Sequence, residues 1–333
     1  PLNKRLEVGA GAGSGSAMKA ATTGFLLLAL AMRAQAPLQL PSVSVMSTRV
    51  AIQDPVATFA MPVSALRYEP LVDLQARNLT EGQADLTVRG GIFEGTGVRV
   101  GATTTIDPQT GHYLAELPVA PAMLTEARVV TGAALVLDAL NATAGGLVYD
   151  WRPIRNGGFV RVGAGEFRTH REEFYQGFAD LATWAGAKVS ADVDVAHSGS
   201  AGAVPFGEHR FDRANLRLQR SGSAGQTDLF AGYQAKFFGW PNLYTPFNSN
   251  ETEDLETTLF VLNHRRNFGG GDFLEGGVSH RRNKDDYAFN RFAPVGPVHP
   301  FQHTTWVDGV AIGGRRRVGE TTWNFRAEVL RDE

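Results

Sequence analysis

The stretch Lys188-Val189-Ser190-Ala191-Asp192-Val193-Asp194-Val195-Ala196-His197 alternates polar and small apolar side chains along its length. In an extended strand, successive side chains point to opposite faces. One face of this strand is therefore apolar, while the other carries the polar groups of Lys188, Ser190, Asp192 and Asp194. The pattern predicts a β-strand that separates two different environments.

The same period of two continues on both sides of this stretch. It is clearest in Asp212–Arg220 and Thr321–Arg331. Weaker examples are Gly158–Arg168, Gln176–Trp184, Thr227–Ala235, Thr257–His264, Asp272–Arg281 and Thr304–Gly313. About nine strands therefore follow residue 155, and their short connections predict hairpins in an antiparallel sheet.

Two properties favour a membrane barrel over a soluble sandwich, whose strands also alternate. The strands run to about ten residues, the length that a tilted transmembrane strand needs. Their second face is densely charged, which suits a water-filled lumen. Aromatic residues fall towards the strand ends, as girdle residues would: Phe159, Phe167, Trp184, Phe211, Phe230, Tyr233, Trp306 and Trp323.

The connections between the predicted strands differ in length. Short ones, such as Ser221–Gln226 and Asn267–Gly271, alternate with long ones at His197–Arg210, Lys236–Glu256 and Arg282–His303. Short turns on one side and long loops on the other are typical of outer-membrane barrels. Because the sequence stops at Glu333 directly after a strand, a sheet edge would stay open, and we expect a fragment of a longer chain.

An export signal precedes the strands. Met18 and Lys19 lead into an apolar run over 20–31, and small residues end it at Ala34-Gln35-Ala36. This pattern predicts a signal peptide over residues 18–36, which is too short for a permanent membrane helix. Because this signal begins at Met18, we expect residues 1–17 to be an upstream leader outside the natural protein. Their glycines lack the spacing of a dinucleotide-binding loop.

The composition argues against several classes of function. The net charge of -2 comes from 32 basic and 34 acidic residues, so no basic field points to nucleic acid. The chain has no cysteine, and Pro300 between His299 and His303 prevents one helix from presenting both histidines. No serine nucleophile elbow is present. We expect no catalytic residue, no metal site and no cofactor, and therefore not an enzyme.

The region before residue 155 contains a different kind of motif. Gln83-Ala84-Asp85-Leu86-Thr87-Val88-Arg89-Gly90-Gly91 is a short strand pattern that ends in Arg-Gly-Gly. Leu71–Asn78 precedes it, and Ala120–Gly132 and Asn141–Tyr149 follow it. Together these blocks resemble the plug domain of TonB-dependent outer-membrane receptors. One helix is predicted within the region, at Val63–Asn78.

The resemblance implies an α+β plug domain over residues 51–154, followed from 155 to 333 by a transmembrane antiparallel β-barrel. A barrel of this class has about 22 strands, so the nine or so predicted strands are its N-terminal part. The chain resembles a divergent member. Val100-Gly101-Ala102-Thr103 stands where the family has "LLDG", and Thr131-Gly132-Ala133 stands where it has Arg-Gly-Pro. Gly232–Gly239 resembles a strand-to-loop segment of cobalamin-receptor-like members.

The same resemblance implies a function in the bacterial outer membrane, without covalent chemistry. The expected activity is TonB-dependent uptake of a large scarce nutrient, such as a ferric siderophore or a corrinoid. The expected partners are the TonB energiser complex, outer-membrane lipid and the small-molecule or chelate substrate. Residues 37–50 would be the periplasmic coupling segment. Its stretch Ser42-Val43-Ser44-Val45-Met46-Ser47 loosely resembles a TonB box, which pairs by strand addition; an ordinary plug strand is the alternative.

A structural motif of the plug is expected at Gln83, Asp85, Arg89, Gly90 and Gly91. Arg89 would bridge carboxylates of the barrel wall with its rigid donor fork. The two glycines would allow the tight turn after the strand. The candidate wall carboxylates are Asp192, Asp194 and Glu275.

Candidate ligand contacts come from two segments. Asp107, Gln109, His112 and Tyr113 lie where such plugs carry an apical loop. The aromatic-rich stretch 237–244 adds Trp240 and Tyr244. The alternative for this second segment is a loop that folds on itself or packs at the membrane interface.

Two other classes of function remain open at this point. A passive porin-like barrel would have the strands without the plug block. A secreted β-sandwich, acting as a binding module or enzyme, would gather its carboxylates in one cleft rather than around a lumen.

Overall fold

The structure of the chain is a computed structural model, and it describes residues 61–77, 82–138, 142–293 and 301–333. All of the described residues belong to one compact unit. The predicted leader at 1–17, the signal peptide at 18–36 and the TonB-box candidate at Ser42–Ser47 lie outside the described residues.

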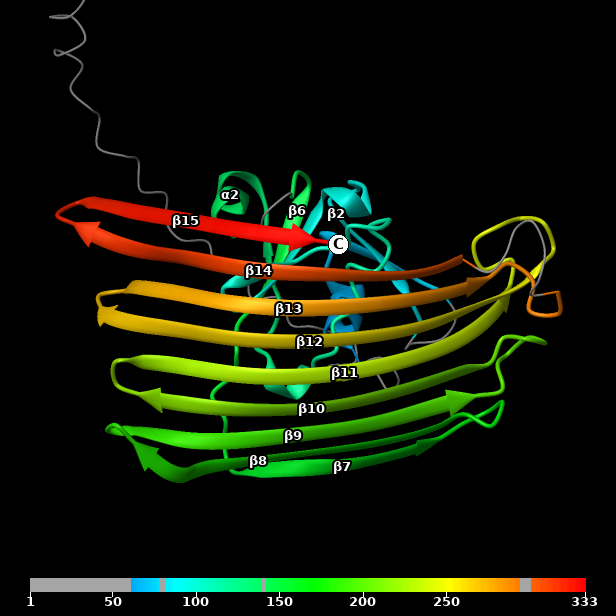
Figure 1. Cartoon of the computed structure of the whole chain (residues 1–333), viewed down its shortest axis with the longest axis horizontal. Coiled ribbons are helices and arrows are strands. Elements are labelled where there is room, and N and C mark those ends of the chain that lie inside the picture. Colours follow the sequence, from blue (N-terminus) through cyan, green and yellow to red (C-terminus); the bar gives the residue numbers. More distant parts are fainter. Residues whose placement is uncertain (1–60, 78–81, 139–141, 294–300) are drawn as a thin grey trace, which may run out of the picture. The chain divides into compact units, whose positions relative to one another are not determined.

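A nine-stranded antiparallel sheet forms the larger part of the described unit (Figure 1). Each strand pairs with the next along the chain, so the spatial order runs from β15 to β7 without a crossover. The strands are β7 (Gly157–Ala164), β8 (His170–Trp184), β9 (Ala187–Ser200), β10 (His209–Gly222), β11 (Gly225–Pro241), β12 (Asn250–Gly269), β13 (Asp272–Ala288), β14 (Phe301–Val318) and β15 (Thr321–Asp332). The prediction of an antiparallel sheet with about nine strands is confirmed.

The connections confirm the predicted asymmetry between the two ends of the sheet. Two-residue turns at 185–186, 223–224, 270–271 and 319–320 lie at one end, on the left in Figure 1. The longer connections 201–208 and 242–249 lie at the other end, on the right, as do residues 289–293 after β13. We call these the short-turn end and the long-loop end. The observed strands reach up to 20 residues in β12, so the predicted strands were too short.

The two faces of the sheet differ as the alternation predicts. One face exposes hydrophobic side chains on successive strands, including Val195, Leu216, Leu229, Phe260 and Val310. The opposite face carries buried polar side chains, including Asp192, Asp194, Arg213, Arg217 and Gln234. Two predicted girdle residues are corrected by this arrangement. Phe211 and Phe230 are each 1% exposed and belong to the central hydrophobic core, because their strand positions have the parity of the inner face.

The plug region packs against the polar face of the sheet. It contains a two-stranded sheet, a four-stranded mixed sheet of order β4-β3-β6-β5, and short helical turns. Its strands are β1 (Val72–Ala76), β2 (Ala84–Val88), β3 (Thr96–Val100), β4 (Thr103–Thr105), β5 (Arg128–Val130) and β6 (Gly145–Tyr149). Its helical elements are η1 (Pro62–Tyr68), η2 (Phe93–Gly95), η3 (Pro121–Met123), η4 (Gly132–Ala134) and α2 (Leu135–Asp138).

The predicted helix at Val63–Asn78 is wrong. The structure has the 3₁₀ helix η1 up to Tyr68 and then strand β1. Pro70 disfavours helical backbone at Glu69, which is extended with ψ 116°. Beyond this break, β1 pairs with β2 from Val72↔Val88 to Ala76↔Ala84.

Across the described ranges, no helix has both the length and the apolar character that would let it cross a membrane.

Two glycines permit close contacts that a side chain would block. A Cβ on Gly91 would lie 2.4 Å from the Cβ of Ala144, so this glycine lets the chain after β2 pack against the approach to β6. A Cβ on Gly232 of β11 would lie 2.2 Å from the carbonyl oxygen of Pro118. The plug backbone therefore comes into direct contact with the wall of the sheet at Gly232.

Amide side chains of the sheet satisfy backbone groups of the plug. The Asn215 side chain accepts a hydrogen bond from the Ala120 N–H and donates one to the Pro118 carbonyl, both at 2.7 Å. Asn263 accepts one from the Ala102 N–H at 2.7 Å. Because the segments around Pro118 and Ala102 are not paired in the plug's own sheets, these side chains replace the missing strand partners.

We predict that Asn215→Ala destabilises the plug more than a surface substitution of the same kind. The change leaves the Ala120 N–H and the Pro118 carbonyl without their partner, at a cost of about 1–3 kcal/mol for each unpaired group. Urea unfolding of the plug, followed by protease susceptibility, measures the effect. Asn324→Ala, at an exposed position of β15, is the matched control. Equal midpoints for both variants would contradict the assigned role.

Candidate ligand-binding site at the plug apex

All six predicted ligand residues lie near the long-loop end of the sheet. Tyr113 packs in one hydrophobic cluster with Phe238, Leu243 and Leu255, and both Trp240 and Tyr244 contact this cluster. The Tyr113 hydroxyl donates a hydrogen bond to Glu253 Oε1 at 3.2 Å. The segment 106–113 of the plug therefore meets the connection between β11 and β12, two segments that are distant in the sequence. We call this region the apex site.

Gln109 connects the apex to β13 and β14. Its amide nitrogen donates to Asp285 Oδ2 at 2.8 Å and lies 3.0 Å from His303 Nδ1. Asp107 caps the same segment, since its Oδ2 accepts hydrogen bonds from the backbone N–H groups of Thr110 and Tyr113 at 3.4 and 3.2 Å. This local turn holds Gln109 and Tyr113 towards the sheet wall.

Arg281 of β13 binds the apical segment 106–113 from the inner face of the sheet. Its guanidinium donates to the Ile106 carbonyl at 3.2 Å and to the Tyr113 carbonyl at 2.9 Å. Arg281 is itself buried, with 3% of its surface exposed. One wall side chain therefore fixes both ends of the apical segment.

His112 belongs to a polar cluster with two residues of the predicted plug motif. Its Nδ1 lies 2.6 Å from Asp85 Oδ1. The Gln83 amide donates to Asp85 at 2.9 Å and to the His112 carbonyl at 2.7 Å. Arg77 donates to the other Asp85 oxygen at 2.7 Å and to the Leu243 carbonyl at 2.8 Å. Gln83 and Asp85 thus position the apical segment from within the plug.

The pKa of Asp85 lies below its usual value. Burial raises this pKa, but hydrogen bonds from His112, Gln83 and Arg77 together outweigh the effect of burial. The carboxylate is therefore ionised at neutral pH, and the cluster needs this charge to hold Arg77 and His112 together.

Two phenols lie beside the carboxylates of the apex site. Burial, and then the charge of Glu253, raise the pKa of Tyr113 and of Tyr244 far above the usual range. Both hydroxyls therefore stay protonated and can donate. Tyr244 also packs its ring under the Arg77 guanidinium, 4.6 Å from the ring centroid, and lies 6.5 Å from the His112 ring.

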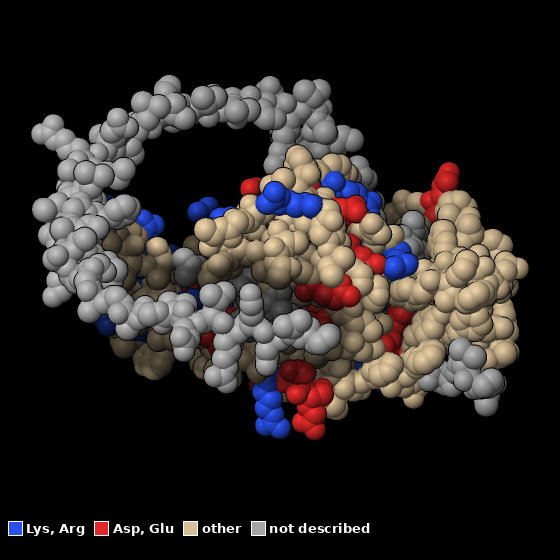
Figure 2. All heavy atoms as spheres, turned by 90° about the horizontal axis from the view of Figure 1, so that it is seen from above, with Lys and Arg blue, Asp and Glu red and all other residues tan. Residues whose placement is uncertain are grey.

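Unpaired buried polar atoms of both kinds gather at the apex site. Within the described parts of the chain, the acceptors Asp107 Oδ1, Gln109 Oε1, Glu253 Oε2 and Asp285 Oδ1 and the donors Arg77 Nε and Arg281 Nε are buried without a hydrogen-bond partner, as is the Tyr244 hydroxyl. Figure 2 shows acidic and basic side chains close together to the right of centre, towards the long-loop end of Figure 1. Unpaired buried polar groups are costly. The site therefore suits a polar ligand that brings both donors and acceptors.

The role predicted for Arg89 is corrected. Arg89 lies in the turn after β2 with φ 55° and is exposed. The three wall carboxylates proposed as partners of Arg89 form ion pairs with other arginines. Asp192 pairs with Arg217 at 2.6 Å and Asp194 with Arg213 at 2.8 Å. Glu275 lies 3.7 Å from Arg99. The strand that contains Asp85 and Val88 ends before Arg89, so the chain turns away there. Gly90 continues the turn with φ 67°.

Several functional contacts were not predicted from the sequence. Lys236 of β11 lies 2.7 Å from Glu116 of the plug, and each side chain is 1% exposed. Gln234 of the same strand donates to Glu116 at 2.6 Å. The sequence predicted Lys236 as the start of a long connection, whereas β11 continues to Pro241, and no local pattern marks Glu116 as its partner. The same holds for Arg77, Glu253 and Asp285.

No family model matches the sequence. No curated protein sequence matches it either.

The fold, in contrast, is similar to that of several solved structures. FpvA of P. aeruginosa bound to heterologous pyoverdines is 13% identical, with a TM-score of 0.59 over 82% of this chain and 40% of that one. The copper transporter OprC is 14% identical, with a TM-score of 0.57 over 83% and 44%. The alcaligin outer-membrane receptor FauA of Bordetella pertussis is 11% identical, with a TM-score of 0.55 over 82% and 43%. The chain spans less than half the length of these structures.

We predict that the acid sensitivity of the apex cluster depends on Asp85. Because the pKa of Asp85 in the folded protein lies below its ordinary value of 3.8, the stabilisation is present above that pH and is lost as the pH falls through the folded pKa. Asp85→Asn should remove this part of the pH dependence and lower stability at neutral pH. Unfolding midpoints between about pH 3 and 7 measure it, with the exposed Asp73→Asn as control. Identical pH profiles for wild type and Asp85→Asn would contradict the prediction.

Proposed function

We propose that this chain, which has the fold of the plug and the N-terminal barrel strands of TonB-dependent outer-membrane receptors, takes part in active import across the bacterial outer membrane. The imported solute would bind at the apex site and pass only when the plug rearranges. The work for this rearrangement would come from the inner-membrane TonB complex. The proposal needs no covalent chemistry.

The observation that carries this proposal is the attachment of the plug to the wall. Plug backbone groups bind side chains from strands far apart in the sheet, including Asn215 of β10, Asn263 of β12 and Arg281 of β13. Thr104 of the plug binds Glu328 of β15 through both its N–H and its hydroxyl, at 2.7 Å each. A solute that follows this wall must displace a hydrogen-bonded plug. This supports energised transport over a passive porin-like pore.

The exposed hydrophobic face supports the outer-membrane location. Side chains at one height on neighbouring strands are exposed, with Leu262 at 44%, Val278 at 44%, Val310 at 59% and Val329 at 71%. The pairing register places Val278 opposite both Leu262 and Val310. A secreted β-sandwich would bury such a continuous apolar surface, whereas lipid covers it without further protein.

The unpaired polar atoms and the aromatic rings of the apex site support a bulky polar ligand. FpvA is described with bound pyoverdine, FauA as an alcaligin receptor and OprC as a copper transporter. For this chain we propose a ferric siderophore, a corrinoid or a similar chelate as the substrate. Trp240 and Tyr244 would offer aromatic faces to it, and Gln109, Glu253 and Asp285 would offer acceptors.

The coupling to TonB is proposed for the segment Ser42-Val43-Ser44-Val45-Met46-Ser47. Its alternating side chains allow an extended strand, and an extended strand can add to a sheet edge of a partner by backbone hydrogen bonds. Pulling on this segment would act on η1 and β1, the first described elements of the plug.

We predict that the complete gene restores growth of a transport-deficient strain on its substrate only when the TonB complex is present. Uptake of labelled candidate chelates in strains with and without the energiser is the measurement. A Val43→Pro, Val45→Pro variant should abolish uptake without lowering substrate binding, because proline removes the strand donors. Uptake that persists without the energiser would reject the coupled mechanism and favour a passive pore.

We also predict that Gln109→Ala weakens binding of the transported chelate by about tenfold, which corresponds to ~1.4 kcal/mol. Gln109 contacts both Asp285 and His303, so its loss loosens the apex site. Gln302→Ala is the matched control, since Gln302 neighbours His303 but is exposed and binds Asp286. Binding to outer-membrane fractions measures both. Equal affinities would place the ligand elsewhere.

A further inference from the structure

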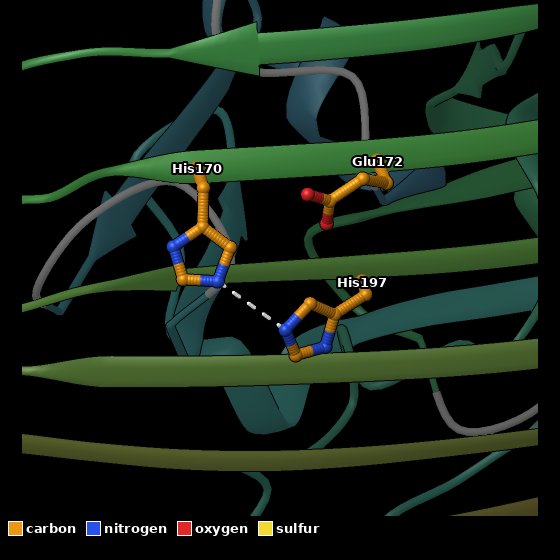
Figure 3. Close-up of side chains that lie close together, drawn as sticks. All are labelled: His170, Glu172 and His197. Atoms are coloured by element: carbon orange, nitrogen blue, oxygen red, sulfur yellow. Dashed lines mark hydrogen bonds between the residues drawn. The ribbon is translucent and has the colours of Figure 1, made fainter.

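Three side chains with metal-binding atoms lie together on β8 and β9. His170 and Glu172 are the first and third residues of β8, and His197 of β9 pairs directly with Glu172 in the strand register. One ligand atom from each residue lies within 4.8 Å of the others. Figure 3 shows the three side chains pointing into the same space from neighbouring strands. Within the described ranges, this is the one such group of three or more.

The cluster is on the face of the sheet away from the plug. His170 and Glu172 are exposed. Glu173, the next residue along β8, points to the opposite face and is buried, and its Oε1 lies 3.3 Å from Arg213 Nη2. The next outward residue along β8, Phe174, is exposed, and so is Val195, two residues before His197. The cluster therefore lies between the apolar band and the long-loop end, where an ion from water can reach it.

The hydrogen bonds of the two histidines determine which ring nitrogens carry protons. His197 Nδ1 lies 2.7 Å from Asp212 Oδ1, and His170 Nδ1 lies 3.1 Å from the carbonyl of Arg168. Carboxylate and carbonyl oxygens only accept, so both Nδ1 atoms carry the proton. The neutral rings then direct both Nε2 lone pairs at each other, across 3.3 Å. Two facing lone pairs repel unless a proton or a metal ion lies between them.

We propose that His170, Glu172 and His197 bind a divalent transition-metal ion of the Zn²⁺ type. Zn–N bonds of 2.0–2.1 Å in tetrahedral geometry place two nitrogens about 3.4 Å apart, and the observed separation of the Nε2 atoms is 3.3 Å. A rotation of the exposed Glu172 side chain completes a set of two imidazoles and one carboxylate. Ligand sets of this kind leave a fourth position open for water or a further ligand.

The surroundings of the cluster fit this role. Metal-binding histidines usually donate their second N–H to a carboxylate or a backbone carbonyl, which fixes the ring and its tautomer. Asp212 does this for His197, and the Arg168 carbonyl does it for His170. The ion would link β8 to β9, and through Asp212 also to β10, close to the connection 201–208.

A matched histidine on the same sheet separates the proposal from ordinary surface binding. His280 of β13 lies 2.7 Å from Asp308 Oδ1 through its Nδ1, as His197 does from Asp212. Among the described residues, no third His, Asp or Glu side chain completes a metal-binding group with this pair. His280→Ala is therefore the control for the loss of an outward His–Asp pair without the loss of a metal site.

The test is metal binding by the whole chain, folded in detergent and freed of metal. Zn²⁺ titration by calorimetry should give one strong site, and Co²⁺ should give the visible absorption of a tetrahedral complex. The double variant His170→Ala, His197→Ala should lose the strong site, and Asp212→Asn should weaken it by about 10–100-fold. His280→Ala should bind as wild type does. Glu172→Gln, which keeps the shape of the side chain, should weaken binding by about tenfold or more if the carboxylate is a ligand.

Two results would overturn the proposal. One is equal Zn²⁺ affinity in wild type and the double variant, which would place the binding elsewhere. The other is no Zn²⁺ or Co²⁺ binding by a wild-type sample shown to be folded, which would mean that a shared proton occupies the space between the Nε2 atoms. Neither measurement depends on transport, so its failure leaves the proposed import function untouched.

Discussion

The structure depends on one constraint, the need of a buried and irregular plug backbone for hydrogen-bond partners. A plug with short strands leaves many N–H and carbonyl groups outside its own sheets, and each unpaired buried group is costly. The inner face of the nine-stranded sheet supplies the partners through Asn215, Asn263 and Arg281. The polar face of each strand is therefore a set of donors and acceptors for another part of the chain. This explains why the alternation pairs small apolar residues with amides and charges.

The same constraint controls the charges between plug and sheet. Arg217 makes two hydrogen bonds to the Asp192 carboxylate, at 2.6 and 3.0 Å, and both side chains are fully buried. Buried pairs of this kind add little to stability over apolar contacts, but the loss of one partner is expensive. Both residues belong to the sheet, and the pair holds Arg217 in place to donate to the Arg152 carbonyl of the plug, at 2.8 Å. The apex site differs, because buried donors and acceptors remain there without a hydrogen-bond partner.

The sequence predicted the elements whose signal is local and periodic. Alternation in Lys188–His197 and its neighbours gave the sheet, its two faces and the unequal ends, and the short motif blocks gave the plug. The apical segment was predicted by resemblance, and its meeting with Trp240 and Tyr244 follows from the fold. Predictions that depended on which residue a side chain contacts, or on the direction in which the chain or side chain points, were wrong. Arg89 turns to solvent after β2, Phe211 and Phe230 face the core, and Pro70 ends the predicted helix early. The odd or even position of a residue along a strand predicts the face on which its side chain lies. It does not predict which plug residue lies opposite, so the contacts of Glu253 with Tyr113 and of Asp285 with Gln109 could not be predicted.

The bond between Thr104 and Glu328 has a consequence for the order in which the molecule folds. The two residues are 224 positions apart, so the plug cannot complete its contacts until the strands from β7 to β15 have been synthesised. Pairings across such separations form slowly, since a long loop must close before any contact compensates for its lost entropy. During that interval the apolar outward face is uncovered and the strand edges lack neighbours, a state that aggregates readily. The tendency to aggregate increases with temperature, because the hydrophobic attraction between unfolded chains strengthens.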